Sequence, residues 1–590
     1  MRVRCFLGAL ALLAGLSACP AWGQSTWVGA PGGDWLDPNN WSPVGVPTDL
    51  ATVDSGSTEL NPIVLTGDTN LKGLDFGTSG AVSGHLLIDG ATMLLDFFDD
   101  TTTHIGNRGT EMSTLKMVNG ARIDMALTGI GNFANDFEVG EHGPGKVTLV
   151  DDGTRLRIND DLKIGAGDPP DAWGEVHVGT PGGTDAPEVY IGSGTSVGRG
   201  SLILSANALF VSGNDTGLYD PLGRQNEGYL TFDEGPNDGP REGIIQDNAR
   251  AYVRTLQNRG AAATLTIKDN GELHIQETEG GAGAGGTVTF AGSGKDSNWG
   301  RDPNGSDLER VIHLMDNAVF TVDSAITTLP VSGFSLGGGE NGSTGGKARM
   351  IIEDNATLDI VQGLQVANGT ASSSQAVLEI RGGNATINLG GDLSFNYDPV
   401  TFNDLPGTGT LLADLSGPAH STINVGGTVY LGTNSTLELT ASGSLGATGT
   451  YFRTLISGDV DPFFSSGVFG NVPAIDTDLG SGVTFKGITY NTDSIVIELF
   501  QNTVLAGDVN GDGWVDGLDY LIWAGNFDTH PGPDGDISDG DLNDDGSVDG
   551  LDYLIWAGDF GNHLSTAVPE PSSLALLGIA LAGLALRRRR

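Results

Sequence analysis

Cysteine is almost absent from this chain of 590 residues, since only Cys5 and Cys19 occur and both lie near the N-terminus. If the first 23 residues are removed, no disulfide can form in the remainder. Its stability must then come from backbone hydrogen bonds, packing and bound metal. The nine histidines are scattered and form no HExxH motif, so the sequence does not support a zinc site.

Basic residues are also scarce, with 29 Lys and Arg against 74 Asp and Glu and a formal net charge of -45. Such an acidic chain repels phosphate backbones, which excludes nucleic acid as a partner. The charge suits a solvated surface and a protein that handles divalent cations. A chain this long exceeds a single compact core, so several domains or an elongated repeat body are expected.

Residues 1–23 have the pattern of a secretory signal. Arg2 and Arg4 form the charged start, an apolar run covers 6–16, and Ala21-Trp22-Gly23 forms a small-x-small cleavage site. The segment 16–19 also resembles a lipoprotein box, in which Cys19 would be lipidated. Cleavage after Gly23 is favoured because a second anchor lies at the other end of the chain.

The C-terminus carries Pro569-Glu570-Pro571, an apolar run over 574–586 and four arginines at 587–590. This order resembles the PEP-CTERM sorting signal, which implies that an exosortase-type enzyme recognises residues 567–590. The arginines would stay cytoplasmic by the positive-inside rule. The apolar run is shorter than the ~20 residues of a membrane span, which suits a transient inner-membrane anchor. The mature protein is then expected on the outer cell surface or in an extracellular polysaccharide matrix.

A duplicated segment contains the clearest chemistry of the chain. Residues 507–527 return at 540–560 with 17 of 21 positions identical, and each copy begins with a twelve-residue loop of the EF-hand type. Calcium prefers six to eight oxygen ligands, which alternate positions of such a loop can supply. The predicted ligands, with Trp514 and Ser547 acting through their carbonyls, are Asp508, Asn510, Asp512, Trp514, Asp516 and Asp519 in the first loop and Asp541, Asn543, Asp545, Ser547, Asp549 and Asp552 in the second.

Residues 507–563 hold fourteen Asp and no Lys, Arg or Glu. So many carboxylates repel one another, so we expect the segment to need two calcium ions to fold. Asp at the twelfth loop position and the duplicated loop–helix plan resemble a type I dockerin domain over 501–563. The resemblance implies docking to a cohesin-like or other protein. Gly517-Leu518 and Gly550-Leu551 replace the Ser/Thr pairs of cellulosomal dockerins, so a cellulosomal cohesin is not implied.

A short helix is predicted after each loop, over 518–527 and 551–560. Leu518, Leu521 and Ile522 fall at helical spacing and are expected to pack against their counterparts. An aromatic stripe runs along a second face of each helix and is predicted either as core or as a partner-binding surface. Its residues are Tyr520, Trp523, Phe527, Tyr553, Trp556 and Phe560.

The body, residues 24–500, repeats a phrase of two alternating strands joined by an Asp-Asn-Gly or similar turn, as in 265–275 and 350–360. Hairpins in linked sandwiches and coils of a parallel β-helix both fit this phrase. A right-handed β-solenoid is favoured, because stacked coils extend one core without disulfides. Trp27, Trp35 and Trp41 and the closing segment 449–500 resemble autotransporter-type bodies. In a solenoid the tryptophans would cap the first coil. The fold class is therefore mainly β, with a small α domain and a hydrophobic C-terminal helix.

No catalytic residue is predicted. The acidic pairs at 99–100, 151–152 and 160–161 lie at turns or strand edges, where Asp is expected for backbone reasons. The favoured function is a non-catalytic cell-surface or matrix protein that binds calcium and docks a partner. The alternative is a secreted polysaccharide lyase or glycoside hydrolase, or an accessory subunit of such a complex. A third hypothesis is carbohydrate binding through Trp173 or Tyr190.

Overall fold

The computed structural model describes residues 24–562 except 55–56, 79–81, 98–102, 128–135, 168–171, 214–227, 233–239, 254, 259–261, 277–297, 300–308, 324–333, 338–346, 368–371, 373, 400–401, 418, 461–466, 503–504, 506, 511, 532–538 and 544. The expected leader and sorting tail, with Pro569, Glu570 and Pro571, lie outside the described residues. Among the helices that the structure describes, none has the length and apolarity needed to cross a membrane.

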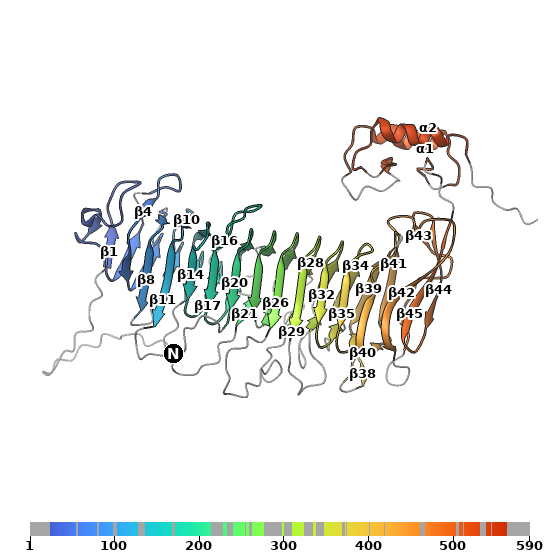
Figure 1. The fold of residues 1–590 in the computed structure, drawn as a ribbon, viewed down its shortest axis with the longest axis horizontal. Coiled ribbons are helices and arrows are strands. Elements are labelled where there is room, and N and C mark those ends of the chain that lie inside the picture. The colour runs from blue at the N-terminus through green and yellow to red at the C-terminus, as the bar shows by residue number, and fades with distance from the viewer. Residues whose placement is uncertain are drawn as a thin grey trace, which may run out of the picture.

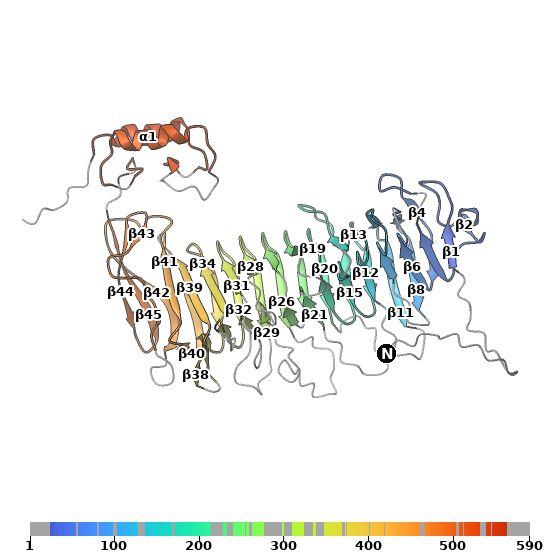
Figure 2. The same ribbon diagram turned by 180° about the vertical axis from the view of Figure 1, so that it is seen from behind.

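The chain is mainly β, and its strands form two long parallel sheets that run along one axis (Figures 1 and 2). One sheet has thirteen strands. They are β4 (Ile63–Leu65), β7 (His85–Asp89), β10 (Ser113–Val118), β13 (Pro144–Leu149), β16 (Trp173–Val178), β19 (Gly200–Leu204), β22 (Arg241–Ile245), β25 (Ala263–Ile267), β28 (Glu309–Leu314), β31 (Lys347–Ile352), β34 (Gln375–Ile380), β39 (Thr408–Asp414) and β41 (Thr436–Thr440).

The larger sheet contains two parallel series of strands. The first series is β5 (Thr69–Leu71), β8 (Thr92–Phe97), β11 (Arg122–Leu127), β14 (Arg155–Ile158), β17 (Glu188–Ile191), β20 (Leu209–Ser212), β23 (Arg250–Val253), β26 (Glu272–Gln276), β29 (Val319–Asp323), β32 (Thr357–Ile360) and β35 (Thr386–Leu389). The second series is β1 (Gln24–Trp27), β3 (Leu50–Val53), β6 (Gly73–Phe76), β9 (Thr103–Ile105), β12 (Phe137–Val139), β15 (Leu162–Ile164), β18 (Thr195–Val197), β21 (Tyr229–Thr231), β24 (Thr255–Gln257), β27 (Asn298–Trp299), β30 (Phe334–Leu336), β33 (Leu364–Val366) and β36 (Leu393–Phe395).

From β4 to β33 each strand pairs in parallel with the strand three places later in the chain. The phrase 265–275 shows the consequence: β25 pairs with β22 and β28, whereas β26 pairs with β23 and β29. The two strands of a phrase therefore belong to different sheets, and the turn between them is a corner rather than a hairpin tip. Paired residues are 22 positions apart at Gly243 and Leu265 and 47 apart at Leu265 and Ile312.

The Asp-Asn turns of the phrase stack into two ladders at this corner. Asp316 has φ +57° and accepts a hydrogen bond from the backbone N–H of Asp269 at 3.1 Å. Asn317 donates to Asn270 at 3.2 Å and accepts from Asn355 at 3.3 Å. Asp and Asn tolerate left-handed backbone better than most residues, and their side chains can bond across coils. The full asparagine ladder is Asn207, Asn248, Asn270, Asn317 and Asn355.

Three tryptophans close the N-terminal end of the stack. Trp27, Trp35 and Trp41 are all buried, with ring centroids 5.2 Å apart for Trp27 and Trp41 and 4.6 Å apart for Trp35 and Trp41. The short strand β2 (Trp41–Ser42) pairs antiparallel with β1, which also pairs in parallel with β3. Aromatic edges and a reversed strand thus cover the first turn of the core.

Antiparallel strands close the C-terminal end. β40 (Ile423–Leu431) pairs with both β35 and β36 and with β42 (Gly449–Val460). β42 then pairs antiparallel with β45 (Ser494–Gln501), which pairs with β44 (Val483–Tyr490), and β43 (Asp478–Gly480) completes this edge. Outside the two long sheets, β37 (Tyr397–Asp398) and β38 (Asn403–Asp404) form a small ribbon, and a 3-10 turn covers Pro38–Asn40. The two α-helices follow at the end of the described chain (Figure 1).

Candidate docking and cation-binding module

The helices α1 (Gly517–Asn526) and α2 (Gly550–Asp559) each begin at an aspartate capping box. Asp516 accepts from the Leu518 N–H at 2.7 Å, and Asp519 accepts from the Asp516 N–H at 2.7 Å. Asp549 and Asp552 make the same bonds in the second copy. These carboxylates satisfy N–H groups that a helix start leaves without partners. The positions predicted as late calcium ligands therefore also fix where each helix begins.

The first loop is curled by its own acidic side chains. Asp508 accepts from the backbone N–H groups of Asp512 at 3.1 Å and Gly513 at 2.7 Å. Asn510 accepts from Asp512 N–H at 2.8 Å, and Asp512 accepts from Trp514 N–H at 2.9 Å. Gly513 has φ +84°, the left-handed conformation that glycine adopts without strain. The alternate loop positions therefore turn their oxygens toward the inside of the curl.

The second loop repeats this arrangement. Asp541 accepts from the N–H groups of Asp545 at 3.2 Å and Gly546 at 2.8 Å, and Asp545 accepts from Ser547 N–H at 3.0 Å. Asn543 accepts from Asp545 N–H at 3.1 Å. The first and last acidic positions of both loops are buried, and these are Asp508, Asp519, Asp541 and Asp552. Burial of carboxylates in a segment without Lys, Arg or Glu favours a bound cation.

The aromatic stripe lies between the two helices. The ring of Trp523 is 5.2 Å from Tyr553, and the ring of Trp556 is 5.1 Å from Tyr520. Phe527 and Phe560 extend the cluster at the helix ends, with rings 5.2 and 5.0 Å from their tryptophans.

The expectation that Leu518, Leu521 and Ile522 pack against their counterparts is wrong for the two leucines, whereas Ile522 is half-buried. Leu518 and Leu521 are 56% and 63% exposed, as are their copies Leu551 and Leu554 at 54% and 63%. The larger aromatic side chains fill the space between the helices, which leaves the leucines outside. Helical spacing predicts both the leucine stripe and the aromatic stripe, but it does not determine which of the two faces the other helix.

Each repeat is completed by the other. Val515 in the first loop exchanges hydrogen bonds with residues 561 and 562 after α2, and Val548 does the same with Asp528 and Thr529 after α1. Val515 and Val548 are both buried. One loop–helix unit alone would therefore lack these backbone partners and the aromatic contacts of the other copy.

This duplicated loop–helix pair can be compared with known domains. Residues 506–557 match the dockerin type I domain. The dockerin domain is a partner-docking module, and its matched range covers both loops and most of α2. Residues 567–590 match the PEP-CTERM protein-sorting motif, which indicates an exported protein that is processed at the cell envelope. No curated protein and no solved structure matches the chain. The autotransporter-type resemblance of the body therefore stays a prediction.

The described aspartates of the acidic pairs in the body accept hydrogen bonds at turns. Asp151 has φ +73° and accepts from Asn119 N–H at 3.0 Å, and Asp152 accepts from Ala186 N–H at 2.9 Å. Asp161 accepts from the Gly194 N–H at 2.8 Å and from the Tyr229 hydroxyl at 3.0 Å. The pair at 99–100 lies outside the described residues. Asp151, Asp152 and Asp161 thus each bond a backbone N–H group that lies 32 to 34 positions away in the chain.

Proposed function

We propose that this chain is an exported, non-catalytic protein of the cell surface or the extracellular matrix. Its dockerin domain would dock a cohesin-like or other protein, and an exosortase-type enzyme would process its tail. The observation that supports this most is the reciprocal build of the dockerin domain, in which two loops and two helices complete one another. Such a domain would present its surface to a partner.

The body of this protein is proposed to be a right-handed β-solenoid that acts as a spacer or adhesive surface. The parallel pairing of each strand with the third strand after it supports this proposal, because successive coils of one chain give that order. Right-handed crossovers are the rule for parallel strands. The stacked corner ladders bond each coil to the next, as an extended support requires.

Two calcium ions are proposed to bind the loops of the dockerin domain. The ligands would be Asp508, Asn510, Asp512, Asp516, Asp519 and the Trp514 carbonyl, with Asp541, Asn543, Asp545, Asp549, Asp552 and the Ser547 carbonyl in the second loop. The curled loops and the buried first and last carboxylates support this assignment. The ions would neutralise carboxylates that no basic side chain of the segment offsets.

The docking surface is proposed to include the exposed leucines Leu518, Leu521, Leu551 and Leu554. Exposed apolar side chains on two short helices are unusual on a free surface and suit a partner that covers them. The exposed edges of Tyr520 and Tyr553 can border the same surface, since each is more than a third exposed. The tryptophans would act from beneath by holding the helices together.

An activity screen tests the non-catalytic proposal. The purified chain is incubated in calcium with acidic and neutral polysaccharides, and both reducing ends and unsaturated products are measured. No release of either product is expected. Release of unsaturated products would make the chain a polysaccharide lyase, and release of reducing ends alone would make it a glycoside hydrolase. Binding without release would favour a polysaccharide partner for the body, with Trp173 and Tyr190 as the residues to change.

A further inference from the structure

A row of charged side chains crosses neighbouring coils of the body on the outside of one strand series. The parallel register places Asp75 on β6 beside His104 on β9, His104 beside Glu138 on β12, and Glu138 beside Lys163 on β15. Lys163 Nζ lies 3.3 Å from Glu138 Oε1. The other oxygen, Glu138 Oε2, lies 3.0 Å from His104 Nε2.

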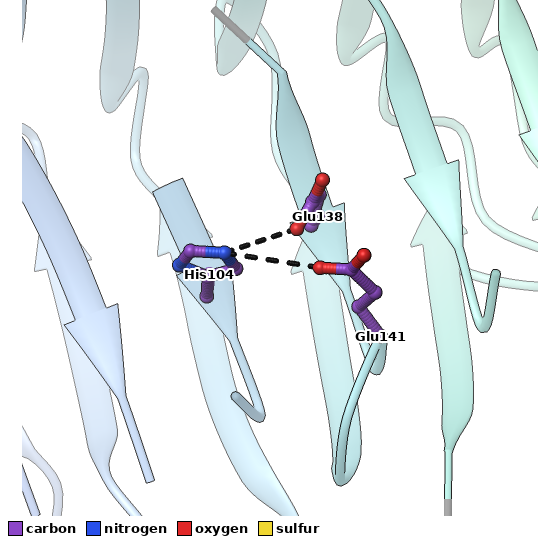
Figure 3. Close-up of side chains that lie close together, drawn as sticks. All are labelled: His104, Glu138 and Glu141. Carbon is purple, nitrogen blue, oxygen red and sulfur yellow. Dashed lines mark ion pairs between the residues drawn. The ribbon is translucent and has the colours of Figure 1, made fainter. Parts of the chain in front are cut away.

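A second carboxylate joins this row from a turn. Glu141 Oε2 lies 3.8 Å from His104 Nε2, so both glutamates point at the same imidazole nitrogen (Figure 3). Gly140, between the two glutamates, has φ +75°, and a Cβ there would lie 2.0 Å from the Trp173 carbonyl oxygen. Only glycine fits this corner, and the corner returns Glu141 to the side of Glu138.

The three groups differ in exposure, and their charges are strongly perturbed. Glu138 is 5% exposed, whereas the side chains of His104 and Glu141 are 22% exposed. Burial alone would lower the pKa of His104, but the nearby carboxylates of Asp75 and Glu138 outweigh it and raise the pKa to about 10. Burial would raise the pKa of Glu138, but the nearby His104, Glu141 and Lys163 side chains lower it to about 2. Burial and the adjacent Glu138 raise the pKa of Glu141 to about 8.

We propose that His104, Glu138 and Glu141 form a binding site for a divalent transition cation of the zinc class on the body of the protein. Their ligand atoms all lie within 4.8 Å of one another. Glu138 Oε2 is buried and accepts no well-formed hydrogen bond from the described residues, although it faces the imidazole. The set therefore presents a nearly buried oxygen aimed at a nitrogen and a second oxygen.

The geometry suits zinc better than calcium. Zinc takes nitrogen and oxygen ligands at about 2.0–2.2 Å, so two ligands of a tetrahedral site lie about 3.3 Å apart. The distances of 3.0 and 3.8 Å from His104 Nε2 to the two carboxylate oxygens bracket that value. Calcium prefers six to eight oxygens and rarely takes imidazole, which separates this site from the dockerin loops. The fourth zinc position is left to solvent.

Neighbouring residues orient these ligands as outer groups do in known metal sites. Asp75 Oδ1 lies 3.5 Å from His104 Nδ1 and is held by the Asn107 amide at 2.8 Å. A carboxylate behind the ring favours the tautomer whose Nε2 lone pair faces the metal. Lys163 occupies the other oxygen of Glu138 and so fixes which oxygen faces the site.

The second acidic group nearby, Asp136, Asp160 and Asp161, offers carboxylate oxygens but no imidazole nitrogen. Lys163 Nζ already lies 2.7 Å from Asp136, and the Tyr229 hydroxyl donates to Asp161 at 3.0 Å. A lysine and a hydroxyl donor thus already contact two of these carboxylates, and the group lacks the nitrogen ligand that favours zinc. The proposal is confined to the histidine-centred set.

Zinc binding to the full chain in excess calcium tests the proposal. Excess calcium saturates the dockerin loops, and bound zinc per chain is measured by equilibrium dialysis. One zinc ion is expected, and His104→Gln and Glu141→Gln should each weaken its binding about tenfold or more. Cobalt(II) is a second probe, because its visible bands report tetrahedral nitrogen–oxygen coordination and should be lost in both variants.

His313→Gln is the matched control. His313 Nε2 lies 2.8 Å from Glu353, 40 positions later in the chain, and among the described residues no third ligand joins this pair. Its zinc binding should equal that of the unchanged chain. Circular dichroism and the thermal midpoint show that each variant is folded. Equal zinc binding by the unchanged chain and folded His104→Gln, or loss in His313→Gln as well, would overturn the proposal.

Discussion

The indole Nε1 of Trp523 donates a hydrogen bond to the backbone oxygen of Asp549, 3.0 Å away in the other repeat of the dockerin domain. Trp556 makes the same 3.0 Å bond to Asp516. Each tryptophan therefore holds the residue that caps the opposite helix and is a predicted ligand of the opposite loop. The two loops are linked through their helices, and a change in one repeat is felt in the other.

This link predicts that Trp523→Phe weakens calcium binding by the second loop more than by the first. Phenylalanine keeps most of the packing but leaves the Asp549 carbonyl without its donor, at a cost of about 1–3 kcal/mol. Calorimetric titration of the full chain with calcium measures both sites. Trp173→Phe is the control, because Trp173 lies on β16 of the body and should leave both affinities unchanged. Equal titrations for the two variants would refute the coupling.

Removal of calcium is expected to unfold both helices of the dockerin domain, because the buried carboxylates would then lack a counter-charge. Asp541→Ala should reduce the calcium bound per chain from two ions to one. Equilibrium dialysis and far-ultraviolet circular dichroism with and without chelator measure these effects. Asp539→Ala changes an acidic residue outside the predicted ligands and should keep both ions. Helix content that is equal in calcium and chelator would contradict the prediction.

The two helix faces should respond oppositely to substitution. Trp523→Ala removes a ring packed between the helices and should lower the stability of the calcium-loaded domain by about 3 kcal/mol or more. Leu521→Ser changes a side chain that is 63% exposed and should shift stability by no more than about 0.5 kcal/mol. Helix unfolding followed by circular dichroism in urea separates them. A larger effect of Leu521→Ser would restore the leucine stripe as the inner face.

Each asparagine of the ladder should stabilise the fold in proportion to the number of ladder hydrogen bonds that it makes. Asn317→Ala removes two ladder bonds, whereas Asn355→Ala at the end of the described ladder removes one. At about 1 kcal/mol per bond, Asn317→Ala is expected to be the more destabilising change. Urea unfolding of the body, followed by tryptophan fluorescence, gives the order. The reverse order would mean that the corner depends on backbone conformation alone.

Low pH should remove the contribution of the Glu353 carboxylate to the stability of the fold. The hydrogen bond from His313 lowers the pKa of Glu353 below its ordinary value, so the ionised carboxylate stabilises the fold above the unfolded-state pKa of about 4.3. That stabilisation is lost as the pH falls through the lower folded-state value. Glu353→Gln should therefore cost about 1 kcal/mol near pH 6 and little at pH 3. Unfolding at both pH values, with His313→Gln and the double variant, measures the pair. A cost that does not change with pH would contradict the assignment.

The sequence by itself determined the features that depend on local spacing. These features lie within short segments of the chain. They are the duplicated loops, the capping aspartates, the Asp-Asn turns and the C-terminal sorting motif. Residues so near to one another in the sequence come into contact regardless of how the rest of the chain folds. The dockerin loops and the sorting motif are therefore recognisable from the order of their residues alone.

Tertiary structure decided which strands pair and which faces lie inward. Two alternating strands joined by a tight turn can form a hairpin or can belong to two different sheets, and the sequence pattern is the same in both cases. Only the pairing of each strand with residues 22 to 47 positions away distinguishes the two arrangements. Likewise, the leucine and aromatic stripes share one helical period, and the volume between the helices selected the aromatics. His104 and Glu138 are 34 positions apart and meet only because parallel register aligns their coils. Contacts between residues so far apart in the chain depend on the packing of the whole body. No local sequence pattern therefore predicts the site formed by His104, Glu138 and Glu141.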